Sequence, residues 1–143
     1  MQEQHKLSIR ERLAQHAAHD PLLADFLAPF PNLLGRDLAG SFERMAKLLG
    51  RWKKTARLQF TLSEEGRERS WNLALTPKSC KAMEGKVNRP NLEIITDAET
   101  WLQIAGRHLS PLEAFGQGKM RVRGDLTLAR LIARRLREPA ASR

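Results

Sequence analysis

The sequence predicts an α+β fold in which helices cover one face of a sheet. Three observations lead to this prediction. Between residues 57 and 95, apolar and polar residues alternate in short stretches separated by polar turns, which is typical of strands with one covered face. Before and after that region, apolar residues recur at helical spacing. The 143 residues suffice for one domain with a sizeable core, and the single cysteine, Cys80, excludes an internal disulfide and a cysteine-based zinc site.

Residues 1–34 are expected to form a helical N-terminal arm. Ser8 and Glu11 have the spacing of a capping box, and an Asp-Pro pair at residues 20–21 restarts the helical pattern. The arm either packs on the body of the same chain or contacts a membrane, a partner protein or a second copy of the chain. The pattern leaves these alternatives open.

The central part of the chain predicts one helix and four strands. The helix spans residues 38–49 and ends at Gly50, and its apolar face consists of Leu38, Phe42, Met45, Ala46 and Leu49. The strands are expected at residues 57–62, 71–76, 79–87 and 92–95. A polar turn at residues 63–66 joins the first two strands as a hairpin.

The remaining elements are two short helices, a strand and a last helix. Capping-box pairs predict where the short helices begin, namely Thr96 with Glu99 and Ser110 with Glu113. A strand over residues 119–123 then leads through Gly124 and Asp125 into the last helix. The apolar residues of this helix are Leu128, Leu131, Ile132 and Leu136.

Positive charge gathers at the C-terminal end. Residues 117–143 hold eight basic and two acidic residues, which is +6 of the net charge of +9. Such an end favours an anionic partner: nucleic acid, an anionic membrane surface or an acidic protein. Arg121 and Arg123 could contact phosphates, but their strand has no aromatic residue for base stacking and the chain has no tyrosine. Nucleic-acid binding is therefore the alternative and not the first prediction.

No motif of a known chemistry stands out. Neither a G-x-S-x-G elbow nor an H-E-x-x-H pair occurs, and Gly116 and Gly118 form too short a pattern for a dinucleotide site. His16 and His19 lie three residues apart, as metal ligands on a helix can, but no third ligand accompanies them. We therefore predict that the chain is not an enzyme and takes no cofactor or metal. No stretch approaches a membrane span or a signal peptide, so we expect a soluble, cytoplasmic protein.

The C-terminal half resembles a known family. The run from Ser110 to Ala129 contains Ala114-Phe115, Gln117-Gly118-Lys119, a short alternating strand, Gly124 and a helix rich in Leu and Ala. This run is similar to the signature of the sterol-carrier-protein lipid-transfer domains. Upstream, Asn91–Glu99 resembles the strand-to-helix step of that family, and Trp71 stands where its domains often have an aromatic strand residue. The resemblance covers about residues 36–137.

The resemblance implies that residues 35–143 form a lipid-binding domain. Its fold would be a five-stranded, mostly antiparallel sheet flanked by helices that enclose an apolar tunnel. The implied ligand is a fatty acid, an acyl-CoA, a sterol-like molecule or an isoprenoid, bound without covalent chemistry. The residues that would line or close the tunnel are Phe42, Met45, Leu49, Phe60, Leu73, Leu102, Phe115, Gln117, Met120, Leu128, Leu131 and Ile132. Those expected to face anionic headgroups or a membrane are Arg121, Arg123, Arg130 and Arg134.

Two questions stay open at this level. The apolar residues either line a tunnel or fill an ordinary core, and periodicity does not distinguish the two. The function is expected to be lipid binding or transfer, with a role as an accessory factor in isoprenoid quinone (ubiquinone) biosynthesis as one form of it. The alternatives are binding of nucleic acid or an acidic partner through the basic end, and a role as a subunit of a lipid-modifying enzyme.

Overall fold

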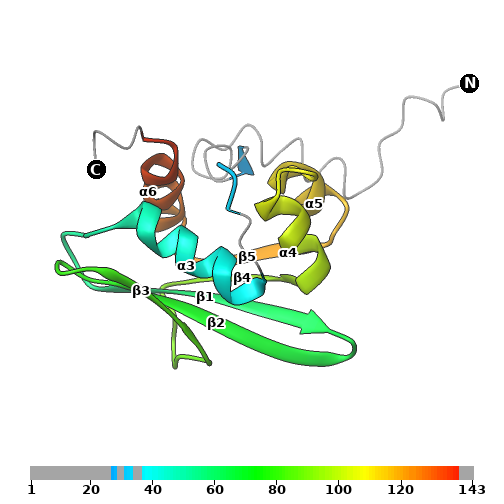
Figure 1. Ribbon diagram of the computed structural model, residues 1–143, viewed down its shortest axis with the longest axis horizontal. Coiled ribbons are helices and arrows are strands. Elements are labelled where there is room, and N and C mark those ends of the chain that lie inside the picture. Colours follow the sequence, from blue (N-terminus) through cyan, green and yellow to red (C-terminus); the bar gives the residue numbers. More distant parts are fainter. Residues whose placement is uncertain (1–26, 29–30, 34–36, 139–143) are drawn as a thin grey trace, which may run out of the picture.

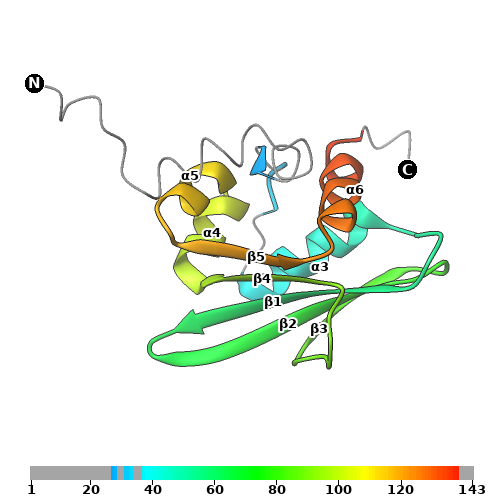
Figure 2. The same cartoon turned by 180° about the vertical axis from the view of Figure 1, so that it is seen from behind.

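A computed structural model describes residues 27–28, 31–33 and 37–138 of the chain, and most of the predicted N-terminal arm lies outside these ranges. The described part contains four helices and five strands in two layers, with the helices on one face of the sheet (Figures 1 and 2). In chain order the elements are α3 (Leu38–Leu49), β1 (Ala56–Glu64), β2 (Arg67–Leu75), β3 (Cys80–Glu84), β4 (Leu92–Asp97), α4 (Ala98–Ala105), α5 (Pro111–Gly116), β5 (Met120–Gly124) and α6 (Leu126–Arg137). The predicted α+β class and the order of these elements are confirmed.

The sheet has the strand order β3-β2-β1-β4-β5. The neighbours pair antiparallel except β1 and β4, which are parallel, so the sheet is mixed. A parallel pair needs a connection that crosses the sheet. Here the segment between β3 and β4 passes over the face opposite the helices, which we call the open face (Figures 1 and 2). The Val87 N–H on this segment donates to Gln59 Oε1 of β1 over 2.9 Å, so the crossing is fixed to the sheet.

Alternation along the strands separates an apolar from a polar face, as the sequence predicts. Leu58, Phe60 and Leu62 of β1 point toward the helices and are fully buried. Gln59 and Thr61 point to the open face, where the crossing segment and neighbouring side chains leave each less than a tenth exposed. One face therefore builds the core and the other carries polar groups that bond to one another.

Local capping accounts for most of the helix boundaries. The Asp37 carboxylate accepts the Gly40 N–H over 2.9 Å at the start of α3, and Gly50 ends that helix as predicted. The predicted capping box of Ser110 and Glu113 is present at α5. The predicted start of α4 is wrong by one residue, because Asp97 and not Thr96 is its N-cap.

Side-chain hydrogen bonds explain why Asp97 and not Thr96 begins α4. Both carboxylate oxygens of Asp97 are occupied by Thr100, whose N–H and hydroxyl each donate over 2.7 Å. Thr96 stays in β4, where its hydroxyl donates to the Lys119 carbonyl beside β5. The expected strand at residues 79–87 is also shorter than predicted, since β3 ends at Glu84 before Gly85 takes a φ of 129°.

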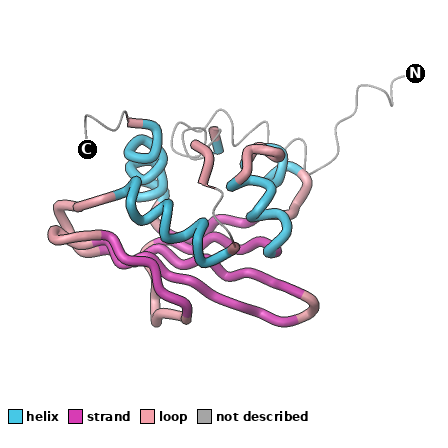
Figure 3. The backbone as a smooth tube through the Cα atoms, in the orientation of Figure 1, coloured by secondary structure: helices cyan, strands magenta, loops and turns pink. Residues whose placement is uncertain are grey.

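Figure 3 shows the helical layer over one face of the sheet. The core is made by the buried apolar side chains of these two layers. Leu27 and Leu33, two described residues of the predicted arm, are also buried in it. The Leu33 N–H donates to the carbonyl of Ala105 at the end of α4 over 2.8 Å. At these positions the chain N-terminal to α3 packs on the body of the same domain.

Candidate functional site

Seven of the residues expected at the tunnel are almost completely buried in the core. They are Phe42, Met45, Leu49, Phe60, Leu73, Met120 and Ile132, and each is at most 2% exposed. Phe42 is at the centre of an aromatic cluster, with ring centroids 4.7 Å from Phe60, 5.3 Å from Trp71 and 5.2 Å from Trp101. Rings at these separations are in contact, so no acyl chain fits between them. Of the two interpretations left open by the sequence, the filled core describes this cluster.

The cluster is also anchored by a buried hydrogen bond. Trp101 Nε1 donates to Ser41 Oγ over 2.8 Å, and this hydroxyl donates to the Leu38 carbonyl over 2.6 Å. Because a buried indole N–H needs an acceptor, Ser41 fixes the Trp101 ring against α3.

The other expected ligand residues lie nearer the surface. Leu102 on α4 and Phe115 on α5 are half-buried, and Gln117 is exposed just after α5. On α6, Leu128 is 8% exposed and Leu131 is 47% exposed, although the sequence pattern assigned both to one apolar face. Leu131 is therefore a large apolar side chain that the fold leaves open to solvent.

Leu128 and Leu131 line a cleft beside α6 with a volume of about 580 Å³, which we call the α6 cleft. Its size falls in the range of ligand pockets. Its walls are one side of α6, the segment from the end of α3 to the start of β1, and the residue just before β4. The residues that line it are Trp52, Lys53, Lys54, Thr55, Ala56, Asn91, Asp125, Thr127, Leu128, Leu131 and Arg135. Two of the predicted ligand residues thus lie together in a cavity, while most of the others form the core beside it.

Arg135 holds Trp52 in the wall of the α6 cleft. Its Nη1 donates to the Leu49 carbonyl over 2.8 Å and to the Arg51 carbonyl over 3.1 Å. Its guanidinium carbon lies 5.3 Å from the centroid of the Trp52 ring, within the range of a cation–π contact. Arg135 therefore joins α6 to the end of α3 and orients the indole.

The charge of the α6 cleft is positive. Lys53 and Lys54 are exposed and form no ion pair within the described residues. The one carboxylate of the lining, Asp125, is already the N-cap of α6, where Oδ1 accepts the N–H groups of Thr127 and Leu128 over 2.9 and 3.2 Å. An apolar wall beside two uncompensated lysines suits an amphiphile with a negative headgroup.

Sequence reasoning missed Trp52, Lys53, Lys54 and Arg135. A signal was present, because a tryptophan stands within the basic run of residues 51–54 directly after the glycine that ends α3. These residues become part of a cleft only because α6 lies beside them, and the local sequence does not show that contact.

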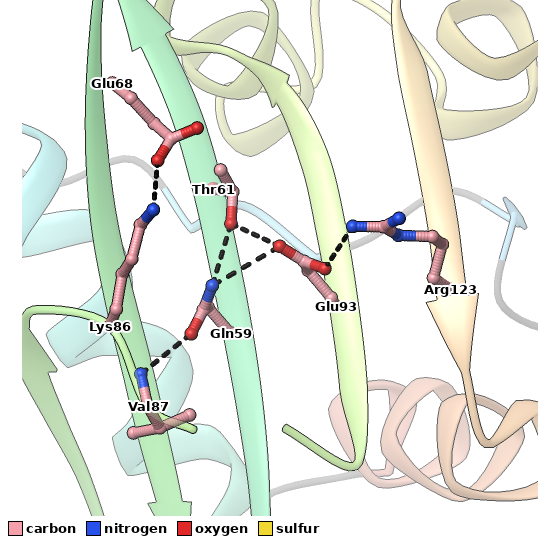
Figure 4. Close-up of polar contacts among 7 residues, drawn as sticks. All are labelled: Gln59, Thr61, Glu68, Lys86, Val87, Glu93 and Arg123. Carbon is pink, nitrogen blue, oxygen red and sulfur yellow. Dashed lines mark hydrogen bonds and ion pairs between the residues drawn. The ribbon is translucent and has the colours of Figure 1, made fainter. Parts of the chain in front are cut away.

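The four arginines expected to face headgroups do not form one surface. Arg121 and Arg123 of β5 lie on the open face, because Met120 and Val122 between them face the helices. Arg130 and Arg134 belong to α6 in the helical layer. Figure 4 shows that Arg123 is paired with Glu93, with its Nη2 2.9 Å from Oε1.

The described part of the chain has no helix long and apolar enough to cross a bilayer. Within residues 27–28, 31–33 and 37–138, no group of three or more His, Cys, Asp or Glu side chains is placed to hold a metal ion. His16 and His19 lie outside these ranges.

Comparison with known proteins decides the family. Residues 38–137 match the sequence model of the SCP-2 sterol transfer family, which is more than half of the chain. The chain belongs to this family. The match agrees with the resemblance that the sequence carries over residues 36–137. No curated protein sequence matches the chain.

Two solved structures with TM-scores above 0.5 support the same fold. The palmitated SCP2L2 of Aedes aegypti, solved by NMR, has a TM-score of 0.57 at 22% identity, and the match covers 71% of this chain and 96% of that chain. The inverting sec-alkylsulfatase Pisa1 from Pseudomonas sp. has a TM-score of 0.54 at 18% identity, covering 75% of this chain and 17% of the sulfatase. A ubiquinone synthesis protein, UbiJ-SCP2, has a TM-score of 0.44 at 12% identity, which is too distant to support an argument about pathway.

The structure explains one residue of the SCP-2 signature. Gly124 has a φ of 113°, and a Cβ at this position would collide with the Asn91 carbonyl oxygen at the start of β4. That oxygen accepts the Asp125 N–H over 2.8 Å, while the Asn91 side chain accepts the Arg57 N–H over 2.7 Å. Gly124 thus lets β5 approach β4 closely enough to place the start of α6, and with it one wall of the cleft.

Proposed function

We propose that this SCP-2 domain binds a single-chain anionic amphiphile, such as a fatty acid or an acyl-CoA, in the α6 cleft. The apolar chain lies against Trp52, Leu128 and Leu131, and the headgroup lies near Lys53 and Lys54. The observation that carries the proposal is Leu131, which this member of the SCP-2 family leaves 47% exposed in a cleft of about 580 Å³ lined also by Lys53 and Lys54.

Binding in the α6 cleft is non-catalytic in this proposal. Of the titratable residues that line it, Asp125 caps a helix and Arg135 is bonded to two backbone carbonyls. The two lysines remain as a source of charge for the headgroup. A role as a subunit of a lipid-modifying enzyme and binding of nucleic acid remain predictions of the sequence.

The choice of ligand follows from the charge and the shape of the α6 cleft. A carboxylate or phosphate headgroup gains from the lysines, whereas an uncharged sterol does not. The palmitated state of the Aedes aegypti relative makes palmitate the first probe. An isoprenoid quinone precursor with an acidic ring substituent has the same chemistry, so the predicted role in quinone biosynthesis is tested with such a precursor as a second probe.

The experiment is a titration of the full chain with palmitate, followed by tryptophan fluorescence and by native mass spectrometry. Leu131→Glu removes an apolar contact and places a negative charge beside the expected headgroup. Because burial of a leucine is worth about 1.5–3 kcal/mol, we expect about tenfold weaker binding or more. Leu112→Glu is the matched control, since Leu112 is 36% exposed on α5 and does not line the α6 cleft.

The two variants also test whether palmitate binds in the α6 cleft or elsewhere in the domain. Equal palmitate binding by the wild type and Leu131→Glu would overturn the α6 cleft as the site. Loss of binding in Leu112→Glu to the same degree would show that added negative charge alone weakens uptake. Circular dichroism of both variants checks that α6 and α5 are intact.

A further inference from the structure

A second cavity lies at the opposite end of the parallel pair β1 and β4. Its volume is about 520 Å³, and we call it the open-face pocket. The α6 cleft includes Ala56 at the start of β1, whereas this pocket includes Ser63 and Asp97 at the ends of β1 and β4. Its lining residues are Thr61, Leu62, Ser63, Gly66, Arg67, Glu68, Ile95, Thr96, Asp97, Gly118, Lys119 and Arg121.

Cations and hydroxyl groups share the open face in this pocket. Arg121 pairs with Ile95 of β4, and Ile95 pairs with Thr61 of β1, so their side chains lie in one row. Lys119 precedes the buried Met120, as Arg121 follows it. The alternation of β5 therefore directs Arg121 to the open face, where Thr61 of β1 also lies, and Lys119, just before β5, lines the same pocket.

The acidic groups around the open-face pocket are occupied by other partners. Glu93 is bonded to Arg123 over 2.9 Å and accepts the Thr61 hydroxyl over 2.6 Å, with Gln59 as a third donor at 3.3 Å (Figure 4). Burial acts to raise the pKa of Glu93, but the hydrogen bonds from Thr61 and Arg123 and the charge of Arg123 outweigh it, so the net pKa is lowered. Glu93 is therefore ionised and already neutralised by Arg123, which leaves Arg121 without this counter-charge.

The two acids in the lining itself are also engaged. Glu68 forms an ion pair with Lys86 at 2.5 Å, which Figure 4 shows on the same face, and Asp97 caps α4 through Thr100. Lys119 and Arg121 are exposed and form no ion pair within the part of the chain that the structure describes. The lining therefore carries three cations, Arg67, Lys119 and Arg121, against the carboxylates of Glu68 and Asp97, and Glu68 is already paired with Lys86, so the net charge of the pocket is positive.

We propose that the open-face pocket binds an oxyanion of the phosphate class, either free phosphate or the phosphomonoester headgroup of a lipid. Arg121 supplies a planar group of donors, Lys119 a point charge, and Ser63 a hydroxyl for a third oxygen. Gly66 and Gly118 contribute no side chain that would fill the space. The site is separate from the α6 cleft and does not depend on the function proposed for that cleft.

The test compares variants on one face of the sheet. The probes are inorganic phosphate, followed by NMR shifts of the full chain, and phosphatidylcholine vesicles that contain either phosphatidic acid or phosphatidylglycerol. The double variant Lys119→Gln with Arg121→Gln removes the two proposed cations. Lys81→Gln is the control, because Lys81 is exposed on the open face at β3 and does not line the pocket.

We expect the double variant to weaken phosphate binding at least about tenfold and Lys81→Gln to leave it unchanged. Binding of inorganic phosphate with this dependence supports a free anion as the ligand. Binding of phosphatidic-acid vesicles alone, with the same dependence, supports a headgroup. Binding of neither probe, an equal loss in Lys81→Gln, or equal binding of phosphatidylglycerol vesicles would overturn the proposal. Leu131→Glu should leave phosphate binding intact, so failure at one site is distinguishable from failure at the other.

Discussion

Replacement of Phe42 by alanine tests whether the aromatic cluster is core or tunnel wall. Phe42 has no exposed surface and its ring contacts the rings of Phe60, Trp71 and Trp101. Removal of a fully buried phenylalanine costs about 3–5 kcal/mol when the neighbours cannot close the space. Here the neighbours are large rings held by the sheet and by the Trp101–Ser41 bond, so we expect about 4 kcal/mol. Since a domain is stable by about 5–15 kcal/mol, the variant should be close to unfolding.

Urea unfolding followed by circular dichroism measures this loss. Phe115→Ala is the matched control, because Phe115 is half-buried on α5 and packs at the edge of the core, so its loss should cost clearly less. If the cluster instead lines a tunnel that holds ligand, Phe42→Ala would only widen the tunnel. A loss below about 1 kcal/mol together with increased uptake of palmitate would refute the assignment of Phe42 to the core.

Three further predictions follow from single residues. Gly124→Ala should lower the free energy of unfolding by clearly more than Gly66→Ala. Both glycines have positive φ, but an added Cβ collides with Asn91 only at Gly124. Equal urea midpoints for the two variants would contradict the close approach of β5 to β4. Glu93 has a lowered pKa in the fold, so its stabilising effect is full above the unfolded pKa of about 4.3 and is lost as the pH falls through the folded value. Glu93→Gln should therefore be less stable than the wild type at neutral pH and lose less stability on acidification, as urea midpoints at both conditions will show. Burial raises the pKa of the Cys80 thiol to about 12, so iodoacetamide should label it slowly in the folded chain and rapidly in urea; fast labelling without urea would mean that β3 opens.

Local signals in the sequence were sufficient for most of the fold. The helical spacing from Leu38 to Leu49 and the capping box at Ser110 each depend on residues within one or two turns, and both are present in the structure. The same kind of signal failed at α4, where Thr96 and Asp97 are both good N-caps. The pairing of β4 with β5 decided between them, because Thr96 donates to the Lys119 carbonyl and is held in the strand.

The site was harder to predict, because it depends on how far apart the elements lie. The apolar periodicity predicts that Phe42 and Phe60 face inward, but it does not predict whether their rings are in contact. The rings do meet, with centroids 4.7 Å apart, so the predicted wall and floor are in contact. The spacing of Leu131 fits the apolar face of α6, but the fold leaves this side chain 47% exposed in the lining of the α6 cleft, which periodicity alone does not show. The four arginines expected to face headgroups lie on two different elements, β5 and α6, and sequence proximity does not show on which side of the sheet each residue lies.

The structure also bears on how a lipid could reach deeper than the α6 cleft. Beneath the cleft α6 is packed through Ile132 and Leu136, which are at most 1% exposed, and Arg135 joins it to the end of α3. Exposing these two side chains costs about 3–6 kcal/mol, at about 1.5–3 kcal/mol each, before the Arg135 bonds are counted. Each methylene group that a ligand buries returns about 0.8 kcal/mol, or roughly a fourfold gain in affinity. A short fatty acid therefore gains too little to displace α6 and should stay in the cleft, whereas a long one can offset the cost. Affinity measured over a series of chain lengths should rise, level off when the cleft is filled, and rise again only if the longest chains separate α6 from the core. A second rise that Leu131→Glu leaves unchanged would place the long-chain site in the core and not in the cleft.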